Sequence, residues 1–430
     1  MKNNRSLPLP PGDLGLPIIG PNLKVKPGFR AENRHKYGDI FKTRFFGMNF
    51  IYLYGKEANR FILSNENIYF VNSSFPNSKT VFGTNTLTWQ RGEKHKESRK
   101  ILFQAFNDRA IKKYLSLAEL ITEKRLEKWS KLDSIELYSA IKNYTFDLNC
   151  QIILGIESAS QTELVNLLKD LGSGIIGLPI PLPQTRFGRA LGSRKKLLKE
   201  IEEIIVRHKN KQQDCALDIL LKTNSFSDRE LKEQIINLIF LGHRELTSAL
   251  SSFCVLMAKN PKVLDRINTE QEKIADLEIS NLEKIKAMTY LETVIKEVLR
   301  LFPPVPGGNR KVIQECSFGG YKIPKNWYVT YDIKSTHQDP EIYSQPDLFL
   351  PERFNLENQE DRKQPYSYIP FGGGLRECLG KELALVIMKI FASTLVSNYS
   401  WKLSSDSDLE NRSEFIPTWQ NVKINIEQIK

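Results

Sequence analysis

The feature that most constrains the fold of this chain is one long helical pattern over residues 228–260. Its start has the spacing of a capping box, in which Ser227 and Glu230 satisfy each other's backbone N–H groups. Its end is marked by Pro261, because the residue before a proline is biased away from the helical conformation. At 1.5 Å per residue, a helix of ~32 residues spans roughly 48 Å, about the width of a large domain. Residues 235–242 are apolar nearly all round, so we expect this helix to be buried on most sides.

The remaining chain predicts a mainly helical protein with a small β portion. Helical periodicity dominates residues 95–300, while residues 38–55 and 319–329 carry β-rich runs around glycine turns. The sequence shows no internal repeat and no linker-like stretch, so we expect a single domain over residues 1–430. Residues 1–20 open it with a proline-rich segment, whose prolines favour an extended course over a helix.

A proline-rich stretch interrupts the helices at residues 177–183, which read Gly-Leu-Pro-Ile-Pro-Leu-Pro. Its three prolines exclude a continuous helix. Because its other side chains are mostly apolar, we expect a connector that is buried against the core. The alternative is a flexible lid over an apolar site, or a loop that touches a membrane.

The charge balance bears on the partners of the chain. Its formal net charge is +12, from 62 lysines and arginines against 50 acids. Acids are interspersed among the basic residues and no nucleic-acid-binding module accompanies them, so we expect no nucleic-acid partner. An acidic protein partner, or peripheral contact with an anionic membrane surface, fits this charge better.

The cysteines bear on the compartment. There are five of them, an odd number without a Cys-x-x-Cys pair, which argues against a disulfide framework and against a structural zinc site. This pattern predicts a reducing, cytoplasmic environment. No window approaches ~18 consecutive apolar residues, and residues 1–5 lack the apolar run of a signal peptide. We therefore expect neither a transmembrane helix nor a secretion signal.

The strongest chemical signal is a glycine-rich stretch that contains one cysteine. Residues 371–380 read Phe-Gly-Gly-Gly-Leu-Arg-Glu-Cys-Leu-Gly and directly precede a predicted helix. The helix N-terminus and Arg376 place Cys378 in a field that favours thiolate, and glycines let the backbone approach a large flat ligand. On the residues alone, two other interpretations stay open. The loop could cradle a phosphate, although the Lys-Ser/Thr ending of a P-loop is missing, or Cys378 could be buried filler.

This stretch resembles the Phe-x-x-Gly-x-Arg-x-Cys-x-Gly haem loop of the cytochromes P-450 at every defining position. The matching residues are Phe371, Gly374, Arg376, Cys378 and Gly380. The resemblance implies the P-450 fold, mainly α with a small β portion, and haem b as cofactor. It also implies that Cys378 is the axial iron ligand, that Phe371 shields its sulfur, and that Arg376 pairs with a haem propionate.

Two further segments resemble a structural feature of the same family. Glu297 and Arg300 are three residues apart on a predicted helix, a spacing that places both on one face. They resemble the Glu-x-x-Arg pair of the family, and residues 351–354 resemble its Pro-Glu-Arg-Phe segment. The resemblance implies that Arg353 completes a structural ion-paired triad with the other two.

Three other residues resemble the propionate contacts of the family. His95 and Arg99 are four residues apart on a predicted helix, and Arg310 follows a Pro-Pro-Val-Pro stretch at residues 303–306. The resemblance implies that these three residues bind the haem propionates. Because the neighbours of His95 are charged, its alternative interpretation is a residue on a solvated helix face.

The long helix departs from the family pattern. Over the haem, the family usually carries an acid followed by a threonine, which steer protons to bound oxygen. The aligned positions here hold Arg244 and Glu245. This replacement makes ordinary oxygen activation doubtful, and it leaves Glu245 as a candidate proton carrier. A shifted helix register would instead bring Thr247 into the place of the alcohol.

The resemblance implies a monooxygenase that inserts one atom of O2 into a lipophilic small molecule. Residues 246–253 are most similar to the branch that contains retinoic-acid hydroxylases of cyanobacteria and animals. We therefore expect a retinoid-like substrate, with terpenoids and fatty acids as alternatives. Apolar residues expected to line its site are Phe75, Phe82, Leu241 and Val305.

Electrons are expected from a separate protein, because the chain shows no flavin, NADPH or iron–sulfur module. Its basic character suits an acidic ferredoxin or a flavodoxin-type donor, and we expect a monomer. Two other activities stay open. One is a haem-thiolate peroxygenase or isomerase, which needs no electron supply, and the other is a haem-binding sensor without turnover.

Overall fold

The chain divides into two compact units in the computed structural model, which describes residues 7–16, 28–45, 47–73, 75, 77–407 and 416–429. The sheet unit comprises residues 1–74, 296–378 and 412–417, and the helical unit comprises residues 75–295, 379–411 and 418–430. The boundary between residues 295 and 296 falls within helix α13 (Thr289–Leu301). The single domain expected over residues 1–430 stays a prediction.

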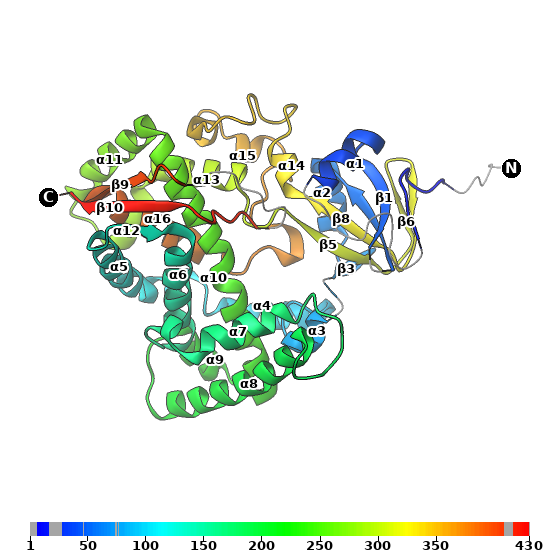
Figure 1. The fold of residues 1–430 in the computed structure, drawn as a ribbon, viewed down its shortest axis with the longest axis horizontal. Helices are drawn as coiled ribbons and strands as arrows, with labels where there is room; N and C mark the ends of the chain where they lie inside the picture. The colour runs from blue at the N-terminus through cyan, green and yellow to red at the C-terminus, as the bar shows by residue number, and fades with distance from the viewer. Residues whose placement is uncertain are drawn as a thin grey trace. The chain divides into compact units, whose positions relative to one another are not determined.

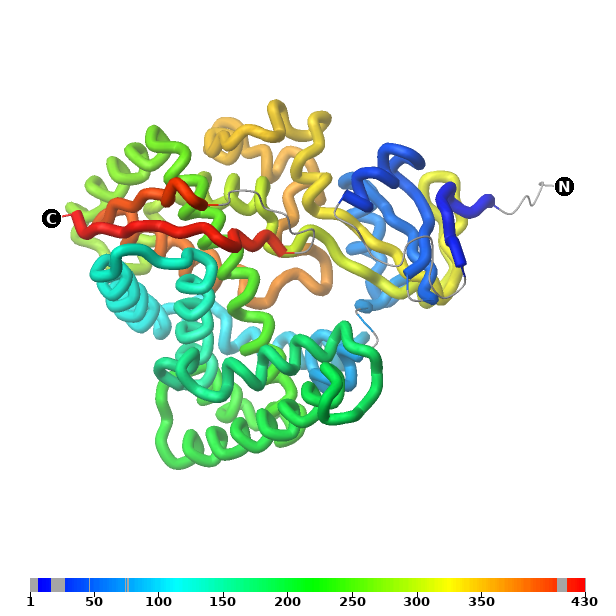
Figure 2. The backbone as a smooth tube through the Cα atoms, in the orientation of Figure 1, coloured from blue at the N-terminus to red at the C-terminus, as the bar shows by residue number. Residues whose placement is uncertain are grey.

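The sheet unit is built on a five-stranded sheet in the order β1-β2-β8-β5-β3. Strand β2 pairs with β1 in antiparallel register and with β8 in parallel register, so the sheet joins two segments that are far apart in the sequence. Figure 2 shows these segments side by side, in blue for the early strands and yellow for the late ones. The elements of this unit are α1 (Phe29–Tyr37), β1 (Ile40–Phe45), β2 (Met48–Leu53), α2 (Lys56–Ser64), β3 (Phe70–Asn72), β5 (Gly307–Val312), β6 (Cys316–Phe318), β7 (Tyr321–Ile323), β8 (Tyr328–Asp332), α14 (Ile333–His337), η2 (Pro351–Phe354), α15 (Glu360–Lys363) and η3 (Gly374–Arg376).

Alternation of apolar side chains places the core of this unit on the sheet. In β1 every second residue is buried, as a half-buried strand requires. Ile51, Phe70, Val312 and Val329 come from four strands and are fully buried in one cluster with α2. The β-rich runs predicted at residues 38–55 and 319–329 are confirmed, because the first contains β1 and β2 and the second contains β7 and the start of β8. Within the proline-rich segment 1–20, residues 7–16 are described and contain no helix, and residues 1–6 and 17–20 lie outside the description.

The helical unit is organised around α10 (Asp228–Lys259), which confirms the long helix predicted from the sequence (Figure 1). Ser227 accepts a hydrogen bond from the backbone N–H of Glu230, whose side chain accepts one from the backbone N–H of Ser227. The predicted capping box is therefore confirmed. The other elements are α3 (Ser78–Phe82), α4 (Gly92–Phe103), α5 (Asp108–Ser130), β4 (Ile135–Glu136), α6 (Leu137–Leu154), η1 (Ala159–Gln161), α7 (Glu163–Ser173), α8 (Arg186–Asn210), α9 (Ala216–Thr223), α11 (Pro261–Ala275), α12 (Asn281–Ala287), α16 (Lys381–Asn398), β9 (Tyr399–Leu403) and β10 (Lys423–Gln428).

Helix α10 is buried along most of its length, but one turn in its middle is exposed. It packs against α6, α8 and α16, and residues 246–257 are buried throughout. At Leu241 and Gly242 the helix is exposed within the predicted apolar middle. The expectation of burial on most sides therefore holds for the helix as a whole and fails at this turn.

The expectation of a buried connector at residues 177–183 is wrong. Leu178, Ile180 and Leu182 are 75%, 44% and 57% exposed, in the segment between α7 and α8. Apolar composition did not lead to burial here, because a segment broken by three prolines has no regular stripe to pack against a neighbouring helix. None of the helices in the described parts of the chain is long and apolar enough to cross a membrane.

Candidate haem-binding residues

In the sheet unit, the cysteine loop presents its thiol at the surface. Cys378 is exposed, and its backbone N–H donates a 2.9 Å hydrogen bond to the carbonyl oxygen of Phe371, which closes the loop. Gly374 has φ +65°, and a Cβ there would lie 2.5 Å from the carbonyl oxygen of Leu63 in α2. This position therefore needs glycine both for its backbone conformation and for its close approach to α2.

Arg310 and Arg376, the two arginines of this unit that were predicted to bind propionates, both form an ion pair with Glu66. Arg376 donates through Nε to Oε1 of Glu66 at 2.6 Å, and Arg310 donates through Nε to Oε2 at 2.8 Å. Glu66 and Arg310 are buried, at 5% exposure each. The sequence predicted Arg310 and Arg376 but missed Glu66, because no local pattern marks a residue 244 and 310 positions away from its partners.

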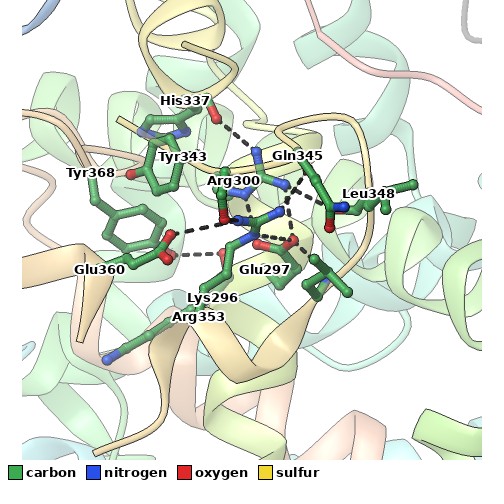
Figure 3. Close-up of polar contacts among 12 residues, drawn as sticks. Lys296, Glu297, Arg300, His337, Tyr343, Gln345, Leu348, Arg353, Glu360 and Tyr368 are labelled. Atoms are coloured by element: carbon green, nitrogen blue, oxygen red, sulfur yellow. Dashed lines mark hydrogen bonds and ion pairs between the residues drawn. The ribbon is translucent and has the colours of Figure 1, made fainter. Parts of the chain in front are cut away.

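The predicted ion-paired triad is confirmed in the sheet unit. Glu297 accepts hydrogen bonds from Arg300 at 2.7 and 2.9 Å and a longer one from Nε of Arg353 at 3.3 Å (Figure 3). All three side chains are at most 3% exposed. Arg300 also donates to the backbone carbonyls of His337, the last residue of α14, and of Leu348, so the cluster joins α13 to the end of α14 and to the loop after it. Its charges are buried, mutually paired and hydrogen-bonded, as buried charges must be.

His337 extends this cluster, and no sequence motif marks it. Its Nε2 accepts a hydrogen bond from the backbone N–H of Ile369 at 3.0 Å, and its ring stacks on Tyr368. Burial, assisted by the charge of Arg300, lowers the pKa of His337 to about 3. The imidazole is therefore neutral at physiological pH and serves as a fixed acceptor.

In the helical unit, α4 carries the pair His95 and Arg99. His95 is buried at 3% exposure, whereas Arg99 is half-buried. The alternative interpretation of His95 as part of a solvated helix face is therefore wrong. Its neighbours in sequence are charged, but Ser98 and Leu102 share its buried face at the spacing of a helix.

The two residues that depart from the family pattern, Arg244 and Glu245, have side chains in different surroundings on α10. The guanidinium of Arg244 is exposed and lies 5.6 Å from the ring centre of Phe240, one turn earlier. Glu245 is half-buried, and its Oε2 is inaccessible to water and accepts no hydrogen bond from any described residue. Burial raises the pKa of Glu245, an effect that the neighbouring charge of Arg244 partly offsets. A carboxyl group whose pKa is raised holds its proton more readily than a solvent-exposed one, which suits a proton carrier.

Thr247 faces a different direction from Glu245. It is fully buried, and its hydroxyl lies 2.7 Å from the hydroxyl of Thr145 on α6 and donates to the carbonyl oxygen of His243 at 2.8 Å. Both contacts tie Thr247 to the packing between α10 and α6. The structure thus places Glu245, rather than Thr247, next to the exposed turn at Leu241 and Gly242.

The helical unit also contains a buried cluster of residue types that can bind a metal ion. Its members are His208, Cys215 and Asp218. His208 lies 2.8 Å from Asp218 through Nδ1 and 3.0 Å from the carbonyl oxygen of Leu154 through Nε2. Asp218 also accepts the backbone N–H of Cys215, which is the N-cap of α9. Every polar atom in the group thus has a protein partner, and the group is explained as the cap that fixes α9.

These residues fit the haem that the family resemblance implies. Haem presents an iron atom, a flat apolar ring and two carboxylates, and the sheet unit offers an exposed thiol, exposed Leu375 and two arginines. The helical unit offers exposed Leu241 and an inaccessible carboxylate oxygen of Glu245 that lacks a hydrogen-bond donor among the described residues. A buried oxygen of this kind needs a hydrogen-bond donor other than the described side chains, which a bound polar group or a water molecule can supply.

Comparison with known proteins agrees with this chemistry. The family model described as cytochrome P-450 matches residues 10–425. Cytochrome P-450 120 of Synechocystis sp. is 40% identical over 417 residues, which cover 95% of this chain and 94% of that protein. Human cytochrome P-450 26B1 is 32% identical over 424 residues, which cover 93% of this chain and 82% of that protein.

A solved structure extends the similarity to three dimensions. It is cyanobacterial CYP120A1 with retinoic acid bound, at 40% identity and a TM-score of 0.91, covering 99% of this chain and 100% of that one. The P-450 fold expected from the sequence is therefore confirmed, and with it haem as the cofactor that the family implies. The chain belongs to the cytochrome P-450 family and is a haem-dependent monooxygenase.

Proposed function

We propose that this protein hydroxylates a retinoid, with retinoic acid as the first candidate. The observation that carries the proposal is its 40% identity, over nearly its whole length, to CYP120A1, which was solved with retinoic acid bound. Apolar side chains that a lipophilic molecule would cover are exposed in each unit, among them Val305 in one and Leu241 in the other. Terpenoids and fatty acids share the apolar character and are the alternatives to be tested.

Cys378 is the proposed iron ligand. The exposed thiol, the glycine at position 374 and the complete loop motif support this role. Arg310 and Arg376 in the sheet unit, and His95 and Arg99 in the helical unit, are the proposed partners of the haem propionates. When bound, thiolate-ligated haem supplies the activation of O2 and the transfer of one oxygen atom to the substrate.

Glu245 is the proposed proton carrier of the reaction. Its raised pKa and inaccessible Oε2 support a carboxyl group that holds a proton and releases it to a bound acceptor. Arg244 cannot take this part, because a guanidinium stays protonated at any physiological pH. The electrons come from an acidic ferredoxin or a flavodoxin-type protein, whose charge is complementary to the +12 of this chain.

The substrate proposal is tested by titration of the purified haem protein with retinoic acid, a terpenoid and a fatty acid. Retinoic acid is expected to shift the Soret band of the haem protein to the high-spin position. Turnover with a ferredoxin system and NADPH should then yield a hydroxylated retinoid by mass spectrometry. A spin shift with the fatty acid or the terpenoid, and none with retinoic acid, would show that the substrate class is wrong.

Oxygen activation is expected to be poorly coupled. The family delivers protons through an acid and an alcohol, whereas this chain has one carboxyl group at those two positions. We therefore expect slower proton delivery, so that part of the electrons from NADPH end in hydrogen peroxide. The double variant Arg244→Glu with Glu245→Thr is expected to raise product formed per NADPH consumed severalfold. The measurement is the ratio of product, peroxide and NADPH in one reaction, with Arg244→Glu alone as control. Tight coupling of the unmodified protein and a worse double variant would contradict this expectation.

A peroxygenase is the second candidate, and the replacement at Arg244 and Glu245 is the observation that favours it. Such an enzyme takes its oxygen atom from hydrogen peroxide and releases water, so it needs neither O2 nor an electron donor. Incubation with substrate and peroxide in the absence of NADPH distinguishes the two functions. Product formed faster with peroxide than with the ferredoxin system would favour the peroxygenase, and no product under either condition would favour a sensor.

A further inference from the structure

Glu66 is a buried acid to which neither the family motifs nor the comparisons assign a role. It lies in the turn between α2 and β3, and its side chain is 3% exposed. Oε1 also accepts the backbone N–H of Asn72 at 3.2 Å, so β3 fixes the carboxylate from one side. Its two arginine partners come from β5 and from η3 in the cysteine loop.

Charge explains why one acid between these arginines matters. Two guanidinium groups that share a buried region repel each other, and neither can lose its proton to relieve the repulsion. A carboxylate that offers one oxygen to each guanidinium holds them at a fixed separation. The cluster still carries a net charge of about +1, so it remains attractive to a further carboxylate.

The hydrogen-bond geometry is compatible with a second anion. Each guanidinium carries five N–H donors, and Glu66 engages both arginines through Nε. Arg310 is further fixed by a 3.0 Å bond from Nη1 to the carbonyl oxygen of Asn309 and by the ring of Tyr331, 5.4 Å away. The arginine is therefore oriented before any ligand arrives, which reduces the entropy lost on binding.

We propose that Glu66 is a positioning residue that holds Arg310 and Arg376 together for the haem propionates. The inference rests on the proposed function only in assigning these two arginines to the propionates. It predicts that Glu66 affects haem binding by holding the two arginines in place, and that Glu66 itself contacts neither haem nor substrate.

The first test measures release of haem from the holoprotein to excess apomyoglobin. Glu66→Gln keeps the size of the side chain but removes the charge, and it is expected to speed release roughly ten- to a hundredfold, as for loss of one charged hydrogen bond. Glu66→Asp keeps the charge but retracts the carboxylate by one methylene, so it should release haem at an intermediate rate. The matched control is Glu57→Gln on α2, whose side chain is 65% exposed and which should behave like the unmodified protein.

Two further readouts separate positioning from a general structural role. Loss of a buried negative charge near the propionates should shift the midpoint potential of the haem upward in Glu66→Gln. In the background of Arg376→Ala, the same substitution should accelerate release much less, because one of its two partners is already gone. Glu66→Asp supplies the release rate and the potential if Glu66→Gln does not fold.

The outcomes distinguish this inference from the proposed function. If Arg310→Ala and Arg376→Ala both retain haem like the unmodified protein, the assignment of the propionate partners fails. If those variants lose haem readily and the Glu66 variants do not, only the positioning role is overturned. Fully additive effects of Glu66→Gln and Arg376→Ala would also overturn it.

Discussion

Replacement of Cys378 by alanine is expected to abolish the strongly red-shifted Soret band of the reduced protein with carbon monoxide. That band reports a thiolate on the iron, and no other residue of the haem loop can supply sulfur. Product formation should fall to background, since the electron density that the thiolate gives to the iron drives O–O cleavage. The measurement is a difference spectrum of the unmodified protein and the variant at equal haem content.

Cys316→Ala provides the control for this substitution. Cys316 is a half-buried cysteine of β6, so the same change there should leave the band in place. A red-shifted band that survives in Cys378→Ala would show that the ligand is another residue. A spectrum of the unmodified protein typical of histidine-ligated haem would have the same meaning.

Replacement of Glu297 by glutamine is expected to lower the free energy of unfolding by about 3–5 kcal/mol, the range for removal of one partner from a buried ion pair. The reason is that Arg300 and Arg353 stay buried and charged while their shared carboxylate is lost (Figure 3). Unfolding of the holoprotein in urea, followed by far-ultraviolet circular dichroism and by the Soret band, measures the loss. Haem should leave at lower urea concentration than in the unmodified protein.

The same substitution at exposed Glu341 is the control and should change stability by less than about 0.5 kcal/mol. Stability of Glu297→Gln within about 1 kcal/mol of the unmodified protein would mean that the ion-paired triad is dispensable. Hydroxylation per haem-containing molecule should remain in the variant, because the triad is buried structure and contacts no proposed substrate residue.

Local signals account for what the sequence predicted of this fold. Ser227, Glu230 and Pro261 fix the ends of α10 through contacts within a few residues, and the observed helix begins and ends within one residue of that expectation. The cysteine loop was recognised from its motif, and the structure supplies a local reason for one of its glycines. Gly374 has a positive φ, and a Cβ there would clash with the carbonyl of Leu63. Local requirements of this kind restrict which residue type can occupy a position, so they can be recognised in the sequence.

Contacts between distant segments account for what the sequence did not predict. Glu66 becomes recognisable only when β3, β5 and the cysteine loop are in place, and its own neighbours in sequence are those of an ordinary turn. For His95, only the alternative interpretation as part of a solvated helix face is wrong. Its charged neighbours suggested exposure, although the spacing of His95, Ser98 and Leu102 on one helix face already indicated burial.

The parallel pairing of β2 with β8 has a consequence for biosynthesis. Ile51 pairs with Val329, so about 280 residues must be translated before β2 can find this partner. At typical elongation rates that interval is roughly 15–60 seconds, during which residues 75–295 can already pack as helices. During this interval the hairpin of β1 and β2 exposes the unpaired backbone N–H and C=O groups of β2, and other nascent chains can associate with this edge. Slower growth or added chaperone during expression should therefore increase the soluble yield, and a chain truncated before β8 should be captured by chaperones through residues 40–53.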